Sequence, residues 1–138
     1  MANTSLTNVI LVADDDADDL FLIRRLLTKA GVKNPVMDFR NGDELVSFLR
    51  PVAAAAEKNG RPCVLFLDIK MPKVDGFEVL RWIRKQSAFA NLPVVMLSGS
   101  DEPRDIKKAT ELGATRYLIK HPPVEVVSRL VAEWTGKQ

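Results

Sequence analysis

Five short apolar runs alternate with longer amphipathic segments along this chain of 138 residues. Apolar strands joined by helices require a parallel sheet that is covered on both faces, with right-handed crossovers. The pattern therefore predicts an α/β domain of the (βα)5 type, a doubly wound five-stranded sheet. We expect strands at residues 9–13, 36–39, 63–67, 94–97 and 117–119, and helices at residues 17–30, 43–59, 77–86, 104–112 and 124–134.

The size and composition are those of one globular domain, with 46% hydrophobic and 28% charged residues. No apolar run approaches the roughly 18 residues of a membrane span, and the N-terminus lacks the pattern of a signal peptide. We expect a cytoplasmic protein without membrane contact. The single Cys63 excludes an internal disulfide and a cysteine metal cluster.

Acidic residues are concentrated near the N-terminus, although the net charge is +2. Basic residues are scattered without interleaved aromatic residues, which argues against direct DNA binding. Clustered carboxylates repel one another, and capping the helix at 17–30 needs only one of them. The cluster therefore indicates a cation site. Its members are Asp14, Asp15, Asp16, Asp18 and Asp19.

Polar side chains follow four of the predicted strands. Carboxyl ends of parallel strands meet at one edge of a sheet, where such folds bind ligands. Three carboxylates, one hydroxyl and one ammonium suit a hard divalent cation together with an anion, and Mg²⁺ with a phosphoryl group fits best. These residues are Asp14 and Asp15, Asp68, Ser98 and Lys120.

Four segments, ILVADDDADD, LFLDIKMPKVDGFEVL, VVMLSGS and YLIK, resemble in order and spacing the receiver domain of two-component response regulators. The resemblance covers about residues 8–134. It implies a flavodoxin-like receiver fold with strand order 2-1-3-4-5. It also implies one response regulatory domain over residues 1–138 without an output domain, so that signalling uses protein contacts. Such a protein catalyses only its own phosphorylation and dephosphorylation and is not otherwise an enzyme.

The resemblance assigns the chemistry to particular positions. Asp68 matches the phosphoacceptor, a carboxylate that takes a phosphoryl group from a kinase histidine as an acyl phosphate. Asp15 matches a direct Mg²⁺ ligand, Asp14 a ligand acting through water, and the backbone carbonyl of Lys70 a further ligand beside Asp68. Lys120 offsets charge on the transferring phosphoryl group.

The resemblance also assigns a switch. Ser98 matches the hydroxyl that bonds the attached phosphoryl group. Tyr117 matches an aromatic residue whose ring turns inward when Ser98 moves, which changes the surface around the fourth helix, fifth strand and fifth helix. Neither Lys70 nor Ser100, which flank the path of an attacking water, can orient that water as a carboxylate or amide would. We therefore expect slow autodephosphorylation.

The expected partners are a sensor histidine kinase and a downstream protein target or phosphotransfer protein. The long second helix and the KNGRP loop resemble single-domain regulators of the phytochrome-associated type, which makes a phytochrome kinase one candidate donor. A homodimer through the fourth helix, fifth strand and fifth helix is also open. In the last helix, Val126 and Leu130 stand off the apolar stripe, so we expect both to be partly exposed. The stripe itself comprises Val124, Val127, Val131 and Trp134.

Two alternatives stay open at this point. A haloacid-dehalogenase-like phosphatase would use the Asp14-x-Asp16 pair, although Asp18 stands where threonine or valine is expected. A non-phosphorylated interaction module on the same fold would have lost a residue of the edge, and none is lost. One departure from the receiver pattern is His121, which separates Lys120 from a proline; whether this segment contains a cis peptide is left open.

Overall fold

The computed structural model describes residues 6–55 and 60–135 and contains a five-stranded sheet in the order β2-β1-β3-β4-β5. All four strand pairs are parallel, which confirms the predicted fold. The elements are β1 (Ile10–Ala13), α1 (Ala17–Lys29), β2 (Val36–Phe39), α2 (Gly42–Ala54), β3 (Val64–Asp68), α4 (Gly76–Lys85), the 3₁₀ helix η1 (Ser87–Phe89), β4 (Val94–Ser98), α5 (Pro103–Glu111), β5 (Arg116–Ile119) and α6 (Val124–Thr135).

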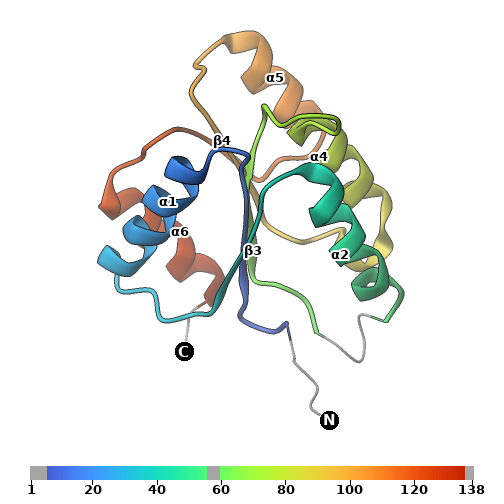
Figure 1. The fold of residues 1–138 in the computed structure, drawn as a ribbon, viewed down its shortest axis with the longest axis horizontal. Helices are drawn as coiled ribbons and strands as arrows, with labels where there is room; N and C mark the ends of the chain where they lie inside the picture. The colour runs from blue at the N-terminus through green and yellow to red at the C-terminus, as the bar shows by residue number, and fades with distance from the viewer. Residues whose placement is uncertain (1–5, 56–59, 136–138) are drawn as a thin grey trace.

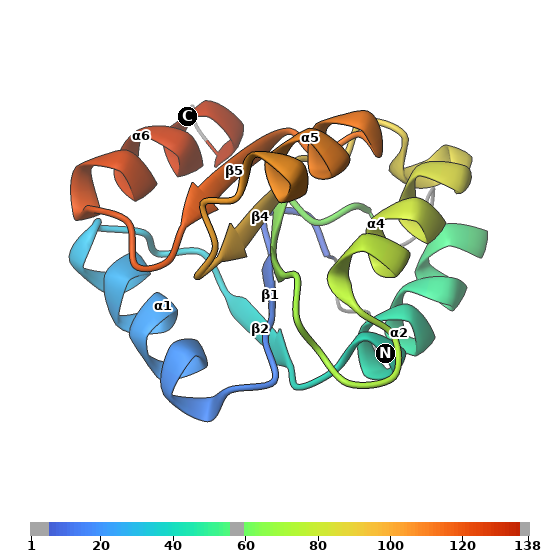
Figure 2. The same cartoon turned by 90° about the horizontal axis from the view of Figure 1, so that it is seen from above.

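Helices cover both faces of the sheet. Figures 1 and 2 show α1 and α6 on one side, and α2, α4 and α5 on the other. Successive residues of a strand point to opposite faces. Ile10 and Val12 accordingly pack in the core beneath α1 and α6, whereas Leu11 and Ala13 pack in the core beneath α2 and α4. Two apolar layers therefore fix the sheet from both sides.

Burial differs strongly between the middle and the edge of the sheet. Every residue of β1, β3 and β4 is buried. In β5, Arg116 and Ile119 are exposed and the two residues between them are half-buried. The carboxyl ends of β1, β3 and β4 are thus held in the interior, while β5 lies at an accessible edge.

Two helices begin with side-chain caps close to the carboxyl edge of the sheet. The Asp16 carboxylate accepts from the backbone N–H groups of Asp18 and Asp19 at the start of α1, as expected for one member of the acidic cluster. A capping box of Asp75 and Glu78 begins α4. The next residue, Gly76, has no space for a side chain, because a Cβ there would collide with the backbone oxygen of Asp68. The loop after β3 is therefore packed tightly under Asp68.

Two expectations about the helices were wrong. The second helix ends at Ala54, not at residue 59; Ala55 follows it as a turn, and residues 56–59 lie outside the described part. Leu130 is buried, at 7% exposure, although Val126 is half-buried as expected. The buried stripe of α6 is centred on Val127, Leu130 and Val131, an i, i+3, i+4 set, so the helix is rotated from the orientation we predicted.

Two further findings concern the described residues. Their backbone contains no cis peptide bond, so the peptide bonds of Lys120 and His121 are trans. Among their helices, none is both long enough and apolar enough to cross a membrane.

Candidate functional site

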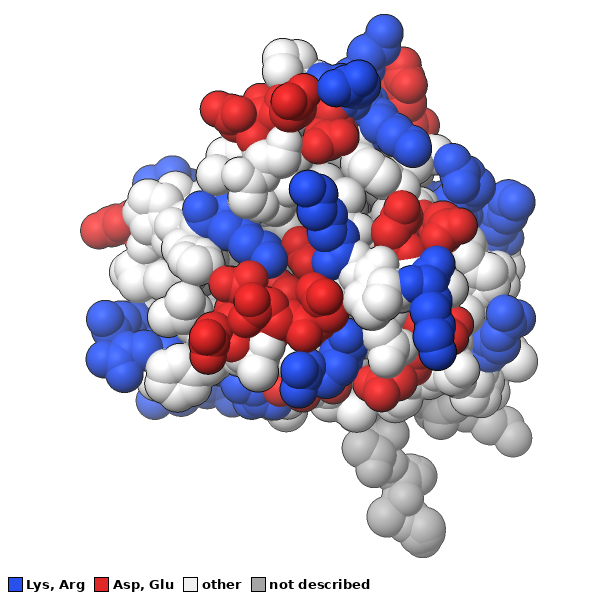
Figure 3. Space-filling view, turned by 45° about the horizontal axis from the view of Figure 1, so that its top comes forward, with Lys and Arg blue, Asp and Glu red and all other residues white. Residues whose placement is uncertain are grey.

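The predicted site residues meet at the carboxyl edge of the sheet. Asp14 follows β1, Asp68 and Ser98 end β3 and β4, and Lys120 follows β5. In Figure 3 acidic side chains gather in the middle of this face, with basic side chains around them. Asp14, Asp68 and Ser98 are buried although they are polar. Buried charges require partners, so their contacts define what the site can do.

Three carboxylates form a candidate cation site. Asp14, Asp15 and Asp68 each offer one oxygen, and these oxygens lie within 4.8 Å of one another. Asp14 and Asp68 are buried, whereas Asp15 is exposed and leaves the site open to solvent. Asp15 and Lys70 line the same surface cleft. Oxygen ligands with an open side suit a hard divalent cation that keeps several waters, so these residues fit the expected metal.

Lys120 is the cation that the structure places among these acids. Its Nζ lies 2.8 Å from Asp14 Oδ2, 2.8 Å from Asp19 Oδ2 and 3.2 Å from Asp68 Oδ1. Burial lowers the pKa of Lys120. The hydrogen bonds to Asp14 and Asp19 and the charge of Asp68 outweigh this effect, so the pKa lies above that of free lysine. Lys120 is therefore a permanent ammonium in this site.

The negative charge of Asp68 is balanced less completely than the positive charge of Lys120. Burial, followed by the charge of Asp14, raises the pKa of Asp68 to about 6, and the ammonium of Lys120 offsets these effects only in part. One ammonium cannot balance the surrounding carboxylates. The edge therefore retains negative charge that a divalent cation would neutralise, and a bound cation would in turn favour the ionised form of Asp68.

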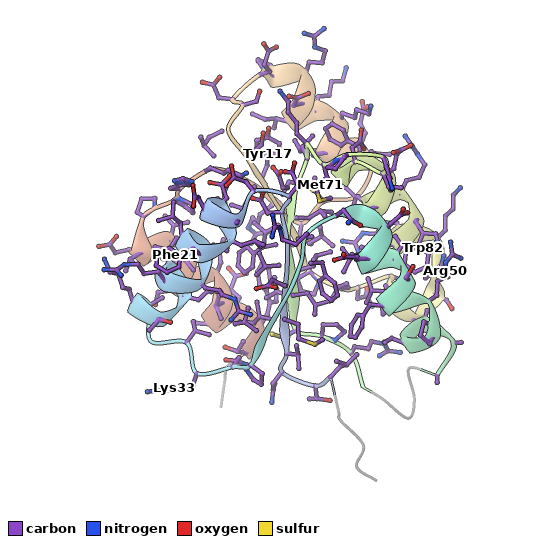
Figure 4. All side chains as sticks on the ribbon, viewed as in Figure 1. Phe21, Lys33, Arg50, Met71, Trp82 and Tyr117 are labelled. Atoms are coloured by element: carbon purple, nitrogen blue, oxygen red, sulfur yellow. The ribbon has the colours of Figure 1, made fainter. Side chains whose placement is uncertain are left out.

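Ser98 and Tyr117 are connected through one loop residue. The backbone N–H of Ser100 donates to Ser98 Oγ at 3.0 Å, and the Tyr117 hydroxyl donates to the Ser100 carbonyl at 2.8 Å. Figure 4 places Tyr117 at the carboxyl edge of the sheet, where its half-buried ring packs against the core beneath α4. A movement of Ser98 would therefore alter the hydrogen bond of Tyr117 through the backbone of Ser100.

Two contacts of the site were not predicted. Asp19 belongs to the acidic cluster, but nothing in the sequence pairs it with Lys120, which lies 101 positions later. His121, which separates Lys120 from the proline, places Nε2 3.0 Å from the other oxygen of Asp19. The extra residue before the proline was the one available signal that this loop is unusual.

Comparisons with known proteins agree with this geometry. Residues 10–131 match the model of the response regulator receiver domain. The chain is 32% identical over 134 residues to the probable methanogenesis regulatory protein FilR2 of Methanothrix harundinacea, covering 93% of this chain and 84% of that protein. It is 29% identical to the response regulator Rcp1 of Synechocystis, covering 89% of this chain and 83% of Rcp1.

Solved structures are similar over nearly the same length. The Mn²⁺-bound form of Rcp1 has a TM-score of 0.72 at 28% identity, covering 91% of this chain and 90% of that one. The bacteriophytochrome response regulator RtBRR has a TM-score of 0.79 at 32% identity, covering 95% of this chain and 80% of that one.

The chain belongs to the response regulator receiver domain family. It functions as a phosphoacceptor in two-component signalling, as the resemblance of its motifs implied. The phosphatase interpretation and the non-phosphorylated module are therefore set aside.

Proposed function

We propose that Asp68 is the residue that accepts the phosphoryl group, in a site that binds Mg²⁺. The observation that carries the proposal is the convergence of Asp14, Asp15 and Lys120 around the buried Asp68 carboxylate. An Asp68 oxygen attacks the phosphorus of a phosphohistidine, the bond from phosphorus to the imidazole nitrogen breaks, and an acyl phosphate forms. Catalysis of this transfer is mostly positioning and charge stabilisation.

The chain's own residues divide the remaining work. Asp14, Asp15, Asp68 and the backbone carbonyl of Lys70 would hold Mg²⁺, which offsets phosphoryl charge when it is bound. Lys120, whose Nζ is 3.2 Å from Asp68 Oδ1, donates to a phosphoryl oxygen. The protein thus promotes its own phosphorylation and dephosphorylation, and does not act as an enzyme on a separate substrate.

The output follows from the Ser98, Ser100 and Tyr117 connection. When Ser98 Oγ turns to bond the phosphoryl group, the Ser100 backbone loses its partner and the Tyr117 hydroxyl bond to that residue is strained. Tyr117 then moves inward. The surface of α5, β5 and α6, which correspond to the fourth helix, fifth strand and fifth helix of the prediction, changes as a result.

Receiver domains interact with histidine kinases, and we infer a phytochrome-type kinase as the donor from the similarity to RtBRR. The target is a protein, either a phosphotransfer protein or another downstream partner. We also propose that the reaction takes place in the cytoplasm, where such kinases present their histidines.

The labelling experiment uses acetyl phosphate as donor and mass spectrometry of the intact protein. The wild type should gain one phosphoryl group only with Mg²⁺, Asp68→Asn none, and Asp15→Ala only a small fraction. Asp43→Asn, which removes an aspartate from the first turn of α2, is the control and should label normally. Stable labelling of Asp68→Asn at another residue would contradict the proposal.

A homodimer through α5, β5 and α6 is a second part of the proposal. Two large apolar side chains of this face are exposed, Ile106 at 37% and Ile119 at 42%. Sedimentation velocity with Mg²⁺ and beryllofluoride, a phosphoryl mimic, should show a dimer that Ile119→Glu abolishes. Phe21→Glu, which changes an exposed residue of α1, should leave the dimer intact. A monomer in every condition would leave only a heterologous partner.

A further inference from the structure

Lys120 has three carboxylate partners, and one of them lies outside the candidate metal site. An ammonium has three N–H donors. The contacts to Asp14 and Asp19 are 2.8 Å long, whereas that to Asp68 is 3.2 Å. Asp14 and Asp68 belong to the group that can hold a cation, and Asp19 does not. The three partners are therefore not equivalent.

A cation in the site would change the balance among these contacts. It attracts the oxygens of Asp14 and Asp68 and repels the ammonium of Lys120. Asp19, in the first turn of α1, is then the carboxylate that keeps Lys120 in the site. The longest contact is the one to Asp68. The Lys120 N–H group that makes this contact can donate instead to a phosphoryl oxygen on Asp68.

Asp19 is itself held in place from the same loop. Its Oδ2 contacts Lys120 and its Oδ1 contacts His121 Nε2 at 3.0 Å, so both oxygens are engaged. The Asp19 side chain is 22% exposed. It borders a small cavity of about 30 Å³ whose other walls include Leu22 and Leu97, which limits competing water. Lys120 and His121, adjacent residues of the loop before α6, thus both contact the Asp19 carboxylate of α1.

We propose that Asp19 is a positioning residue for phosphoryl transfer: it anchors the ammonium of Lys120 beside Asp68, and His121 fixes the orientation of the Asp19 carboxylate. This rests on the proposed role of Asp68 and deepens it. The Lys120 ammonium donates a hydrogen bond to Asp19 Oδ2 at 2.8 Å.

The test compares Asp19→Ala with Asp18→Ala. Asp18 is exposed in the same helical turn and is not a partner of Lys120, so its variant removes equal charge from the helix N-terminus. With acetyl phosphate and Mg²⁺, Asp19→Ala should label about tenfold more slowly, as the loss of a charged hydrogen bond would require. Asp18→Ala should stay within about twofold of the wild type. His121→Ala should have a smaller effect in the same direction as Asp19→Ala.

A second readout separates positioning from a structural role. The ¹⁵Nζ chemical shift of Lys120, which reports the hydrogen bonds of its ammonium, should change in Asp19→Ala and in the isosteric Asp19→Asn but not in Asp18→Ala. Asp19→Asn carries the test if Asp19→Ala does not fold. Equal labelling rates and equal Lys120 Nζ chemical shifts in the Asp19 and Asp18 variants would overturn the inference. If the wild type were not labelled at Asp68, the proposed function would fail, while the NMR comparison would still judge Asp19.

Discussion

The two ends of the functional edge are built differently. At one end, Asp14 follows β1 and Asp68 ends β3, and these central strands are buried throughout. At the other end, Tyr117 lies in β5 and Lys120 follows it; β5 is the last strand of the sheet, and its first and last residues are exposed. Figure 2 shows β5 between these two helices.

The difference suggests a division of labour. Buried central strands hold the carboxylates within a fixed distance of one another, as phosphoryl transfer requires. An edge strand with half-buried residues can shift at lower cost, as a switch requires. In the proposed mechanism, the phosphoacceptor and the metal-binding carboxylates therefore lie where the sheet is most constrained, and the response at Tyr117 lies where the sheet is least constrained.

The largest expected effect tests this contrast in stability. Phe66 in β3 is fully buried, so Phe66→Ala should lower the free energy of unfolding by about 3–5 kcal/mol. Ile119 in β5 is 42% exposed, and Ile119→Ala should cost less than about 1 kcal/mol. Urea unfolding measures both. Similar losses would show that β5 is as constrained as β3.

The next effect concerns the pH dependence of stability that arises from the buried carboxylate of Asp68. The pKa of Asp68 is raised from 3.8 to about 6 by burial and by Asp14. A raised pKa in the folded state stabilises the protein below about pH 4, and this stability is lost as pH rises through about 6. Asp68→Asn does not titrate, so it should exceed the wild type in unfolding free energy at pH 8 by up to about 3 kcal/mol.

Unfolding of both proteins at pH 4 and pH 8 measures this difference. The gap should nearly close at pH 4, and Mg²⁺ should narrow it at pH 8 by stabilising the wild type alone. If the wild type were as stable as Asp68→Asn at pH 8 without metal, ionised Asp68 would not destabilise the folded protein, and this prediction would be wrong.

The smallest expected effect concerns the lifetime of the acyl phosphate. Lys70 is exposed beside the site and cannot orient a water as an amide can. Lys70→Asn should therefore accelerate loss of the phosphoryl group about threefold. Lys73→Asn is the control, because Lys73 has φ 67, a conformation that asparagine tolerates. Decay followed by mass spectrometry decides, and equal rates for the wild type and Lys70→Asn would count against the expectation.

Which side chains meet at the carboxyl ends of the strands was largely predictable from the sequence, whereas the packing of the helices around them was not. Continuous apolar runs and the carboxyl-end rule place Asp14, Asp68 and Ser98 together, because these depend only on local pattern and on strand direction. The Asp19 contact with Lys120 depends on how α1 packs against the loop before α6, which no local pattern encodes. The misjudged burial of Leu130 has the same origin, since a helix can rotate by tens of degrees about its axis without changing its sequence period.

The central claim is that phosphorylation at the constrained end is read at β5, and the chain's single tyrosine allows a direct measurement. Protein labelled with ¹³C in tyrosine gives one ring signal, from Tyr117, whose hydroxyl bonds the Ser100 carbonyl at 2.8 Å. Adding Mg²⁺ and beryllofluoride should shift that signal in the wild type and leave it unchanged in Asp68→Asn. An unshifted signal in wild-type protein that has bound the mimic would contradict the account.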